Sequence, residues 1–204
     1  MNVPAWNPAL EFMERDALER LQLAALRKTV AWALKTPFYQ RRLADAGLKH
    51  PEDIASLRDL RNIPYTTKDD LRGACPHGLL AVELEQVVRL HTSSGTTGMP
   101  TVIYHTRQDL DHWTELVARC IVATGVTARD VFQNMTSYGL FTGGLGLHYG
   151  AERVGMLVIP ASSGNTSRQL QLMKNFRTTV VHATPSYLLH LHASLAGEGV
   201  TPDQ

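Results

Sequence analysis

The feature that most constrains the fold of this chain is a change in hydrophobic pattern near residue 86. Beyond it, short runs rich in Val, Ile and Leu alternate with segments whose apolar residues follow helical spacing. The strand-like runs cover residues 87–91, 101–105, 131–135, 156–160 and 179–183. Helical segments begin near residues 106, 143, 166 and 184. Because strands separated by helices pair through crossover connections, the pattern predicts an α/β fold with a mainly parallel sheet.

The residues before this change have a helical pattern. Apolar residues recur at helical spacing at positions 23, 26, 30 and 34. This stripe predicts a helix that ends at Pro37, followed by a second helix over about residues 38–46. Thr67 and Asp70 have the spacing of a capping box, in which each side chain bonds the backbone N–H of the other residue. A third helix is therefore expected to begin at this point.

Charge divides the chain in a similar place. The charged residues are concentrated in the first 75 positions, as is typical of a solvated helical region, and the remainder is more apolar. We therefore expect a helical N-terminal region over residues 1–80 and an α/β subdomain over residues 81–204.

Composition excludes several classes of protein. The chain has 204 residues, a net charge of +1 and a hydrophobic fraction of 44%, which argues against disorder and against nucleic-acid binding through bulk charge. Cys75 and Cys120 form no CxxC motif, so buried thiols are expected rather than a disulfide framework or a zinc site. No apolar run is long enough for a membrane span, and the first residues do not resemble a secretory signal. A cytoplasmic location without a membrane or nucleic-acid partner is expected.

A loop between two predicted strands has the composition of a phosphate-binding site. Hydroxyl and glycine residues fill it, namely Ser93, Ser94, Gly95, Thr96, Thr97 and Gly98. Glycines let the backbone approach a ligand with its N–H groups exposed, and hydroxyls add side-chain donors, which suits a polyphosphate. The segment is not a Walker A loop, because GxxxxGK[ST] is absent. A hairpin turn rich in Ser, Thr and Gly is the alternative interpretation.

A second candidate site starts at Tyr138. Glycines at positions 139, 143, 144, 146 and 150 accompany two aromatic residues, Tyr138 and Phe141. Glycines against aromatic rings can leave a flat slot for an aryl ligand. The alternative is a glycine-rich helix start with core aromatics, and His148 is either a border of the pocket or a hydrogen-bonded core residue. Further along, Thr166 is expected to cap a helix, and His190 and His192 point to different faces of a helix and form no metal pair.

Taken together, these segments resemble a known family. The loop at residues 93–101 resembles the phosphate-binding signature of adenylate-forming enzymes, and three further segments resemble the phenylacetate–CoA ligase family in particular. These are residues 63–72, 138–146 and 163–166, supported by residues 148–153 and 184–187. The resemblance is collinear from about residue 14 to about residue 195.

The resemblance implies a two-step reaction. A small aromatic carboxylic acid would react with ATP to give an acyl-adenylate and pyrophosphate, and CoA would then displace AMP. ATP, Mg²⁺ and CoA are the implied cofactors, and a homodimer is implied as well. Residues 93–98 would hold the β- and γ-phosphates. The implied pocket for the aryl acid consists of Tyr138, Phe141, Gly143 and Gly144.

The resemblance also leaves functions open. Close relatives have Lys where this chain has Met99, so ATP binding is expected either to be weaker or to be unaffected if that lysine is exposed. Members of the family are about twice as long, and the expected catalytic residues and magnesium ligand have no counterpart in these 204 residues. The chain is expected to be the N-terminal part of the ligase, incomplete for catalysis alone. A non-catalytic module that binds an aryl acid or a nucleotide is the alternative.

Overall fold

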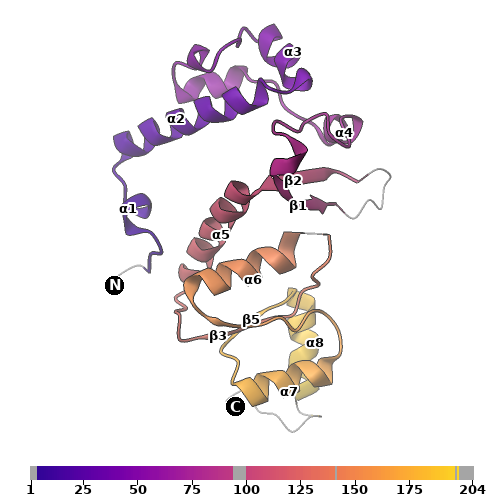
Figure 1. Ribbon diagram of the computed structural model, residues 1–204. Helices are drawn as coiled ribbons and strands as arrows, with labels where there is room; N and C mark the ends of the chain where they lie inside the picture. The colour runs from indigo at the N-terminus through magenta and orange to yellow at the C-terminus, as the bar shows by residue number, and fades with distance from the viewer. Residues whose placement is uncertain (1–3, 94–99, 141, 196, 198–204) are drawn as a thin grey trace. The chain divides into compact units, whose positions relative to one another are not determined.

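The computed structural model describes residues 4–93, 100–140, 142–195 and 197. The chain forms two compact units (Figure 1). One is Pro8–Arg107, and the other combines residues 4–7 with the described residues from Gln108 onward. The division expected near residue 80 concerns the extent of the binding subdomain and stays a prediction.

The unit Pro8–Arg107 begins with one long helix and several short ones around a small apolar core. Its helical elements are α1 (Pro8–Glu11), α2 (Arg15–Ala33), α3 (Pro37–Asp45), η1 (Pro51–Asp53), η2 (Leu57–Asn62), α4 (Lys68–Gly73) and η3 (Leu84–Gln86). Val30, Leu43, Leu48 and Ile54 form the core. The helical spacing predicted α2, but Pro37 was wrongly expected to end it. Pro37 instead opens α3, at the helix position where a missing N–H costs nothing.

The capping box predicted at α4 is confirmed. The Thr67 hydroxyl accepts from the Asp70 N–H at 3.2 Å, and the Asp70 carboxylate accepts from the Thr67 N–H at 2.8 Å. Both bonds satisfy N–H groups that the first helical turn leaves without partners. The same carboxylate lies 3.0 Å from the Arg42 guanidinium, which connects α3 to α4.

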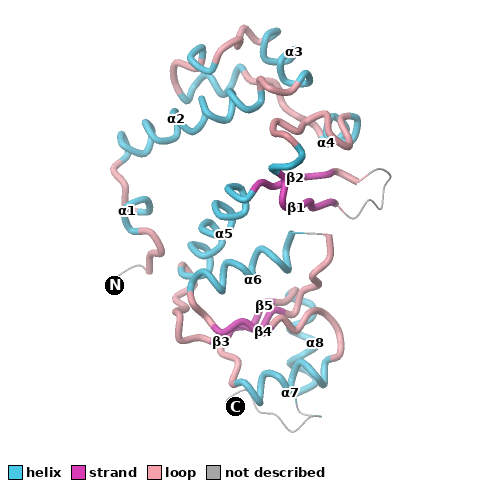
Figure 2. Tube along the Cα trace, viewed as in Figure 1, coloured by secondary structure: helices cyan, strands magenta, loops and turns pink. Residues whose placement is uncertain are grey.

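A β-hairpin completes this unit. Strands β1 (Val87–Thr92) and β2 (Val102–Thr106) are antiparallel, with Thr92 opposite Val102, and lie side by side in Figure 2. Both strands were predicted, and the loop that joins them holds residues 94–99, which lie outside the described residues. Ser93 closes the base of this loop, because its N–H donates to Thr101 O and its hydroxyl accepts from Thr101 N–H, each at 3.0 Å.

The second unit is an α/β layer structure. Its elements are α5 (Arg107–Val122), β3 (Val131–Asn134), α6 (Thr142–Val154), β4 (Leu157–Ile159), α7 (Thr166–Phe176), β5 (Val180–His182) and α8 (Pro185–Leu195). The sheet order is β4-β3-β5, and β3 is parallel to both neighbours. The α/β fold with parallel strand pairs is therefore confirmed.

Side chains of β3 alternate between two apolar layers. Phe132 packs with Ala151 of α6 and Ile121 of α5, whereas Met135, just after the strand, packs with Leu170 of α7. Accordingly, α6 covers one side of the sheet and α7 the other in Figure 1. The chain passes from β3 to β4 on one flank and then to β5 on the opposite flank. Such a reversal at the carboxyl end of a central strand opens the crevice where α/β sheets bind ligands.

Two local predictions, one of which concerns both units, are wrong. Asn165, in a left-handed conformation with φ of 50°, caps α7 by accepting from Arg168 N–H, so Thr166 is the first helical residue and not the cap. The thiols are not buried: Cys120 is exposed and Cys75 half-buried. On α5 the buried position beside Cys120 is Ile121, which is 7% exposed.

Candidate functional site

Asn134 is the centre of a hydrogen-bond network at the carboxyl end of β3. Its side chain is fully buried. The amide nitrogen donates to the Tyr138 hydroxyl at 2.9 Å and to Gly144 O at 2.8 Å. The amide oxygen accepts from the Thr136 hydroxyl at 2.8 Å and lies 3.0 Å from His182 Nδ1 at the end of β5. One buried side chain thus holds together two strand ends, the following loop and the start of α6.

A second step of the network runs from Tyr138 along α6. The Tyr138 hydroxyl lies 3.2 Å from His148 Nδ1, and His148 Nε2 lies 3.0 Å from the carboxylate of Glu152. The rings of Tyr138 and His148 meet edge to face, with centroids 5.6 Å apart. His148 is therefore a hydrogen-bonded residue beside a predicted pocket side chain. Glu152 is half-exposed, so the chain of contacts leads from the buried sheet edge towards solvent.

Burial tunes two titratable groups of the network. Burial raises the pKa of Tyr138, the hydrogen bond from Asn134 acts against that rise, and the negative charge of Glu152 adds to it. Burial lowers the pKa of His182, whose ring stacks on Phe132 with centroids 6.3 Å apart. Both shifts favour the neutral form of the side chain.

A pair of buried amides supports the other face of β3. Gln133 donates to the side-chain oxygen of Gln169 at 2.7 Å and accepts from the Thr178 hydroxyl at 2.8 Å. Gln169 in turn donates to Ser162 O at 2.7 Å. These bonds fix the loop after β4 against α7. The backbone at the carboxyl edge of the sheet is therefore held in place on the α7 face as well.

The glycines of α6 mainly serve close packing. A Cβ at Gly146 would lie 2.4 Å from Trp113, and one at Gly150 would lie 2.3 Å from Val117, so these two let α5 approach α6. At Gly144, a Cβ would lie 2.4 Å from Ser137 O, where the loop before the helix folds against it. Helix packing, and not the flat slot expected from the glycine pattern, therefore explains why glycine occurs at positions 146 and 150.

The structure brings together some of the predicted site residues. Tyr138 and Gly144 share the Asn134 amide, and Gly143 is half-buried in the first turn of α6. Phe141 lies outside the described residues. Among the loop residues, Ser93 belongs to the Pro8–Arg107 unit, whereas Ser94, Gly95, Thr96, Thr97, Gly98 and Met99 lie outside the described residues.

Sequence reasoning missed Asn134, His182 and Glu152 as members of the network. A signal for the first was present: Gln133 and Asn134 interrupt the apolar run 131–135 at its carboxyl end, where a buried amide requires partners. His182 likewise lies at the carboxyl end of a short apolar strand, β5. Nothing in local spacing indicates that these two strand ends are neighbours.

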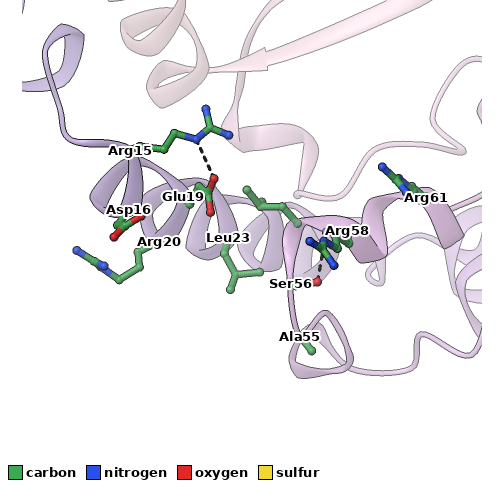
Figure 3. Close-up of a pocket in the computed structure, with 10 residues that line it drawn as sticks. Arg15, Asp16, Glu19, Arg20, Leu23, Ala55, Ser56, Arg58 and Arg61 are labelled. Carbon is green, nitrogen blue, oxygen red and sulfur yellow. Dashed lines mark hydrogen bonds and ion pairs between the residues drawn. The ribbon is translucent and has the colours of Figure 1, made fainter.

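A cleft in the other unit contains none of these residues. It has a volume of about 610 Å³, and Figure 3 shows α2 on one side and η2 on the other. Its lining is Arg15, Asp16, Glu19, Arg20, Leu23, Ala55, Ser56, Leu57, Arg58 and Arg61. The Arg15–Glu19 pair in its wall, at 2.8 Å, is exposed to solvent and therefore contributes little to stability.

The described part of the chain lacks both a metal-binding cluster and a membrane-spanning helix. Residues 4–93, 100–140, 142–195 and 197 contain no group of three or more His, Cys, Asp or Glu side chains placed to hold a metal ion. Within the same ranges, no helix has both the length and the apolarity to cross a membrane.

Comparison with known proteins identifies the lineage of the chain. No family model matches it. A phenylacetate–coenzyme A ligase of Pseudomonas putida is 46% identical over 198 residues, which is 95% of this chain and 44% of that protein. The corresponding ligase of Escherichia coli is 48% identical over 183 residues, 89% of this chain and 42% of that protein. This chain is a homologue of the phenylacetate–CoA ligases.

Solved structures agree with this relationship to the phenylacetate–CoA ligases. A 2-hydroxyisobutyryl-CoA ligase in complex with 2-HIB-AMP and CoA matches with a TM-score of 0.88 and 28% identity, over 97% of this chain and 43% of that chain. The same ligase in its postadenylation state, with 2-HIB-AMP, matches with a TM-score of 0.87 and 26% identity. The chain spans less than half the length of the relatives that it matches.

Proposed function

We propose that this chain supplies the acid-binding and phosphate-binding parts of an ATP-dependent aryl-acid CoA ligase of the phenylacetate type. The observation that carries the proposal is the Asn134 network, which joins Tyr138 and Gly144 at the carboxyl end of the central strand. That edge is the ordinary ligand-binding place of a parallel sheet. The homology to phenylacetate–CoA ligases supports an aromatic acid as the ligand.

In the proposed reaction, a carboxylate oxygen of the acid attacks the α-phosphorus of ATP, and the bond from that phosphorus to the pyrophosphate oxygen breaks. The sulfur of CoA then attacks the acyl carbon, AMP leaves with the carbon–oxygen bond electrons, and the thiol proton passes to solvent. Such a reaction depends on positioning and on stabilising phosphate charge. Aromatic and glycine residues at 138, 141, 143 and 144 would position the acid, and residues 93–98 would bind the β- and γ-phosphates.

We assign binding, rather than turnover, to these 204 residues. The whole ligase would use ATP, Mg²⁺ and CoA, and ligand-bound CoA ligase structures contain an acyl-AMP and CoA. The described residues offer no cluster that fits a metal ion, so no step of the proposal passes through Mg²⁺ held by them. A homodimer in the cytoplasm, with α/β binding residues over 81–204, completes the proposal.

The test is a thermal melt of the 204-residue chain alone, with phenylacetate, with Mg-ATP, and with both. A ligand at 100 times its dissociation constant stabilises the folded state by about 2.7 kcal/mol. Phenylacetate is expected to raise the melting temperature, and acetate, which lacks the ring, is not. Ser93→Ala is expected to weaken the response to Mg-ATP and leave the response to phenylacetate unchanged. A chain that responds to neither ligand would contradict the proposal.

A further inference from the structure

We infer that His148 sets the hydrogen-bond polarity of Tyr138, so that the pocket presents an acceptor to an aromatic acid and not a donor. The inference rests on the proposed function and adds a specificity determinant to it. It predicts a preference for aromatic acids that carry a ring hydroxyl over those whose ring oxygen can only accept.

The orientation of the Asn134 amide is the first step. Gly144 O is an acceptor only, and it lies 2.8 Å from the amide nitrogen. A flipped amide would place its oxygen against this carbonyl and its NH₂ group against the Thr136 N–H, which lies 3.3 Å from the present oxygen. The nitrogen therefore faces Gly144 and Tyr138. Its second hydrogen is donated to the Tyr138 oxygen at 2.9 Å, which makes that oxygen an acceptor there.

Glu152 determines the tautomer of His148. An ionised carboxylate can only accept, so the His148 Nε2, at 3.0 Å from it, carries a proton. In the neutral imidazole, Nδ1 is then an acceptor. The phenolic hydrogen of Tyr138 satisfies it across 3.2 Å. A histidine that donates one ring N–H to a carboxylate has its tautomer fixed in this way in many proteins.

The consequence concerns what Tyr138 has left for a ligand. Its only hydrogen is donated to His148, one lone pair is taken by Asn134, and one lone pair remains. The groups that face His148 from the loop and from α6 are Tyr138, Tyr149 and Glu152. A ligand hydroxyl can donate to the free lone pair, whereas a methoxy oxygen at the same ring position cannot. A typical net hydrogen bond corresponds to roughly 3- to 10-fold in affinity.

The experiment measures dissociation constants by titration calorimetry at pH 8, using the 204-residue chain. The ligands are phenylacetate and its hydroxy and methoxy derivatives at ring positions 2, 3 and 4. At one ring position, the parent chain is expected to prefer the hydroxy acid over the methoxy acid. This ratio of dissociation constants is expected to be about 3- to 10-fold larger for the parent chain than for Tyr138→Phe. Tyr65→Phe, at a tyrosine that is 92% exposed, is the matched control and is expected to behave like the parent chain.

His148→Leu separates polarity from shape. Without the imidazole, the Tyr138 hydrogen is released and can be donated to a hydroxy or a methoxy oxygen alike, so the preference for the hydroxy acid is expected to fall to about the value for Tyr138→Phe. A purely structural role of His148 would weaken all acids alike. Nitrogen-15 spectra of the parent chain supply a readout without ligand: a protonated Nε2 and an accepting Nδ1 are expected for His148, and the opposite tautomer overturns the inference.

Failure of this inference differs from failure of the proposed function. If phenylacetate binds and Tyr138→Phe leaves the hydroxy-to-methoxy preference unchanged at every position, the polarity inference is wrong and the proposed function stands. If none of the acids binds, both are overturned.

Discussion

The indole ring of Trp113 occupies the place of a side chain at Gly146. A Cβ built on this glycine would lie 2.4 Å from Trp113 Cζ2, closer than real Cβ atoms approach any neighbour. One turn further along, Gly150 makes the same kind of contact with Val117, at 2.3 Å. The close approach of α5 and α6 therefore depends on two glycines spaced one helical turn apart.

Gly146→Ala is expected to lower the free energy of unfolding by about 1–3 kcal/mol, because the added methyl group forces the indole or the helix to move. The measurement is a denaturant titration. Gly73→Ala is the matched control: this glycine is also helical, and nothing lies within 4 Å of an added Cβ. Alanine there is expected to be neutral or to stabilise by up to about 1 kcal/mol. Equal effects at both sites would contradict the packing argument.

Asn134→Leu is expected to destabilise the second unit by about 2–4 kcal/mol. The replacement has the same number of side-chain heavy atoms but removes the hydrogen-bond partner of Gly144 O and of His182 Nδ1. Unfolding in urea measures the effect. Asn175→Leu, at an exposed asparagine inside α7, is the control that shows what loss of an exposed amide costs. A loss below about 0.5 kcal/mol at Asn134 would mean that water replaces the amide and that the network is not essential.

His182 is expected to make stability depend on pH. Burial lowers its pKa in the folded state, so the unfolded chain binds a proton more readily. The contribution of the neutral imidazole is therefore complete above the unfolded pKa of about 6.5 and is lost as the pH falls below it. Melting temperatures between pH 8 and pH 5.5 measure the slope. His182→Gln removes the titrating group and is expected to flatten this part of the curve.

The stability of α7 is expected to depend on the side chain of Asn165 and not on that of Thr166. Asn165→Ala removes the bond to Arg168 N–H and places alanine at a φ of 50°, so a loss of about 1–2 kcal/mol is expected. Glycine adopts the same backbone angle without strain, so the loss of stability in Asn165→Gly is expected to be smaller than in Asn165→Ala. Thr166→Ala, inside the helix, should change the unfolding midpoint little. The reverse order for Asn165→Ala and Thr166→Ala would restore Thr166 as the cap.

Much of the fold follows from local sequence. The strands at β3, β4 and β5 and the capping box at Thr67 were predictable because each depends on residues within a few positions of one another. The cap of α7 was not, because a left-handed Asn165 shifts the helix start by one residue and hydrophobic spacing does not detect such a shift. The sequence also suggested that glycines 146 and 150 line a slot, since spacing alone does not show that α5 lies against them.

The candidate site was predictable only in part. Tyr138 and Gly144 came from the glycine-aromatic segment and the family resemblance. The side chain that joins them, Asn134, also contacts His182, which lies 48 positions further along the chain. Such a contact arises from strand pairing across the sheet, so it depends on topology rather than on local spacing.

The two adjacent amides of β3 have a further consequence for folding. Gln133 bonds to α7 on one face of the sheet and Asn134 to α6 on the other, while Phe132 and Met135 enter the apolar layers. Sliding this strand by one residue would exchange its faces, turning each amide away from its hydrogen-bond partners and placing each apolar residue against the wrong helix. Strand misalignment, a common error of short sheets, is therefore penalised twice at the centre of this one.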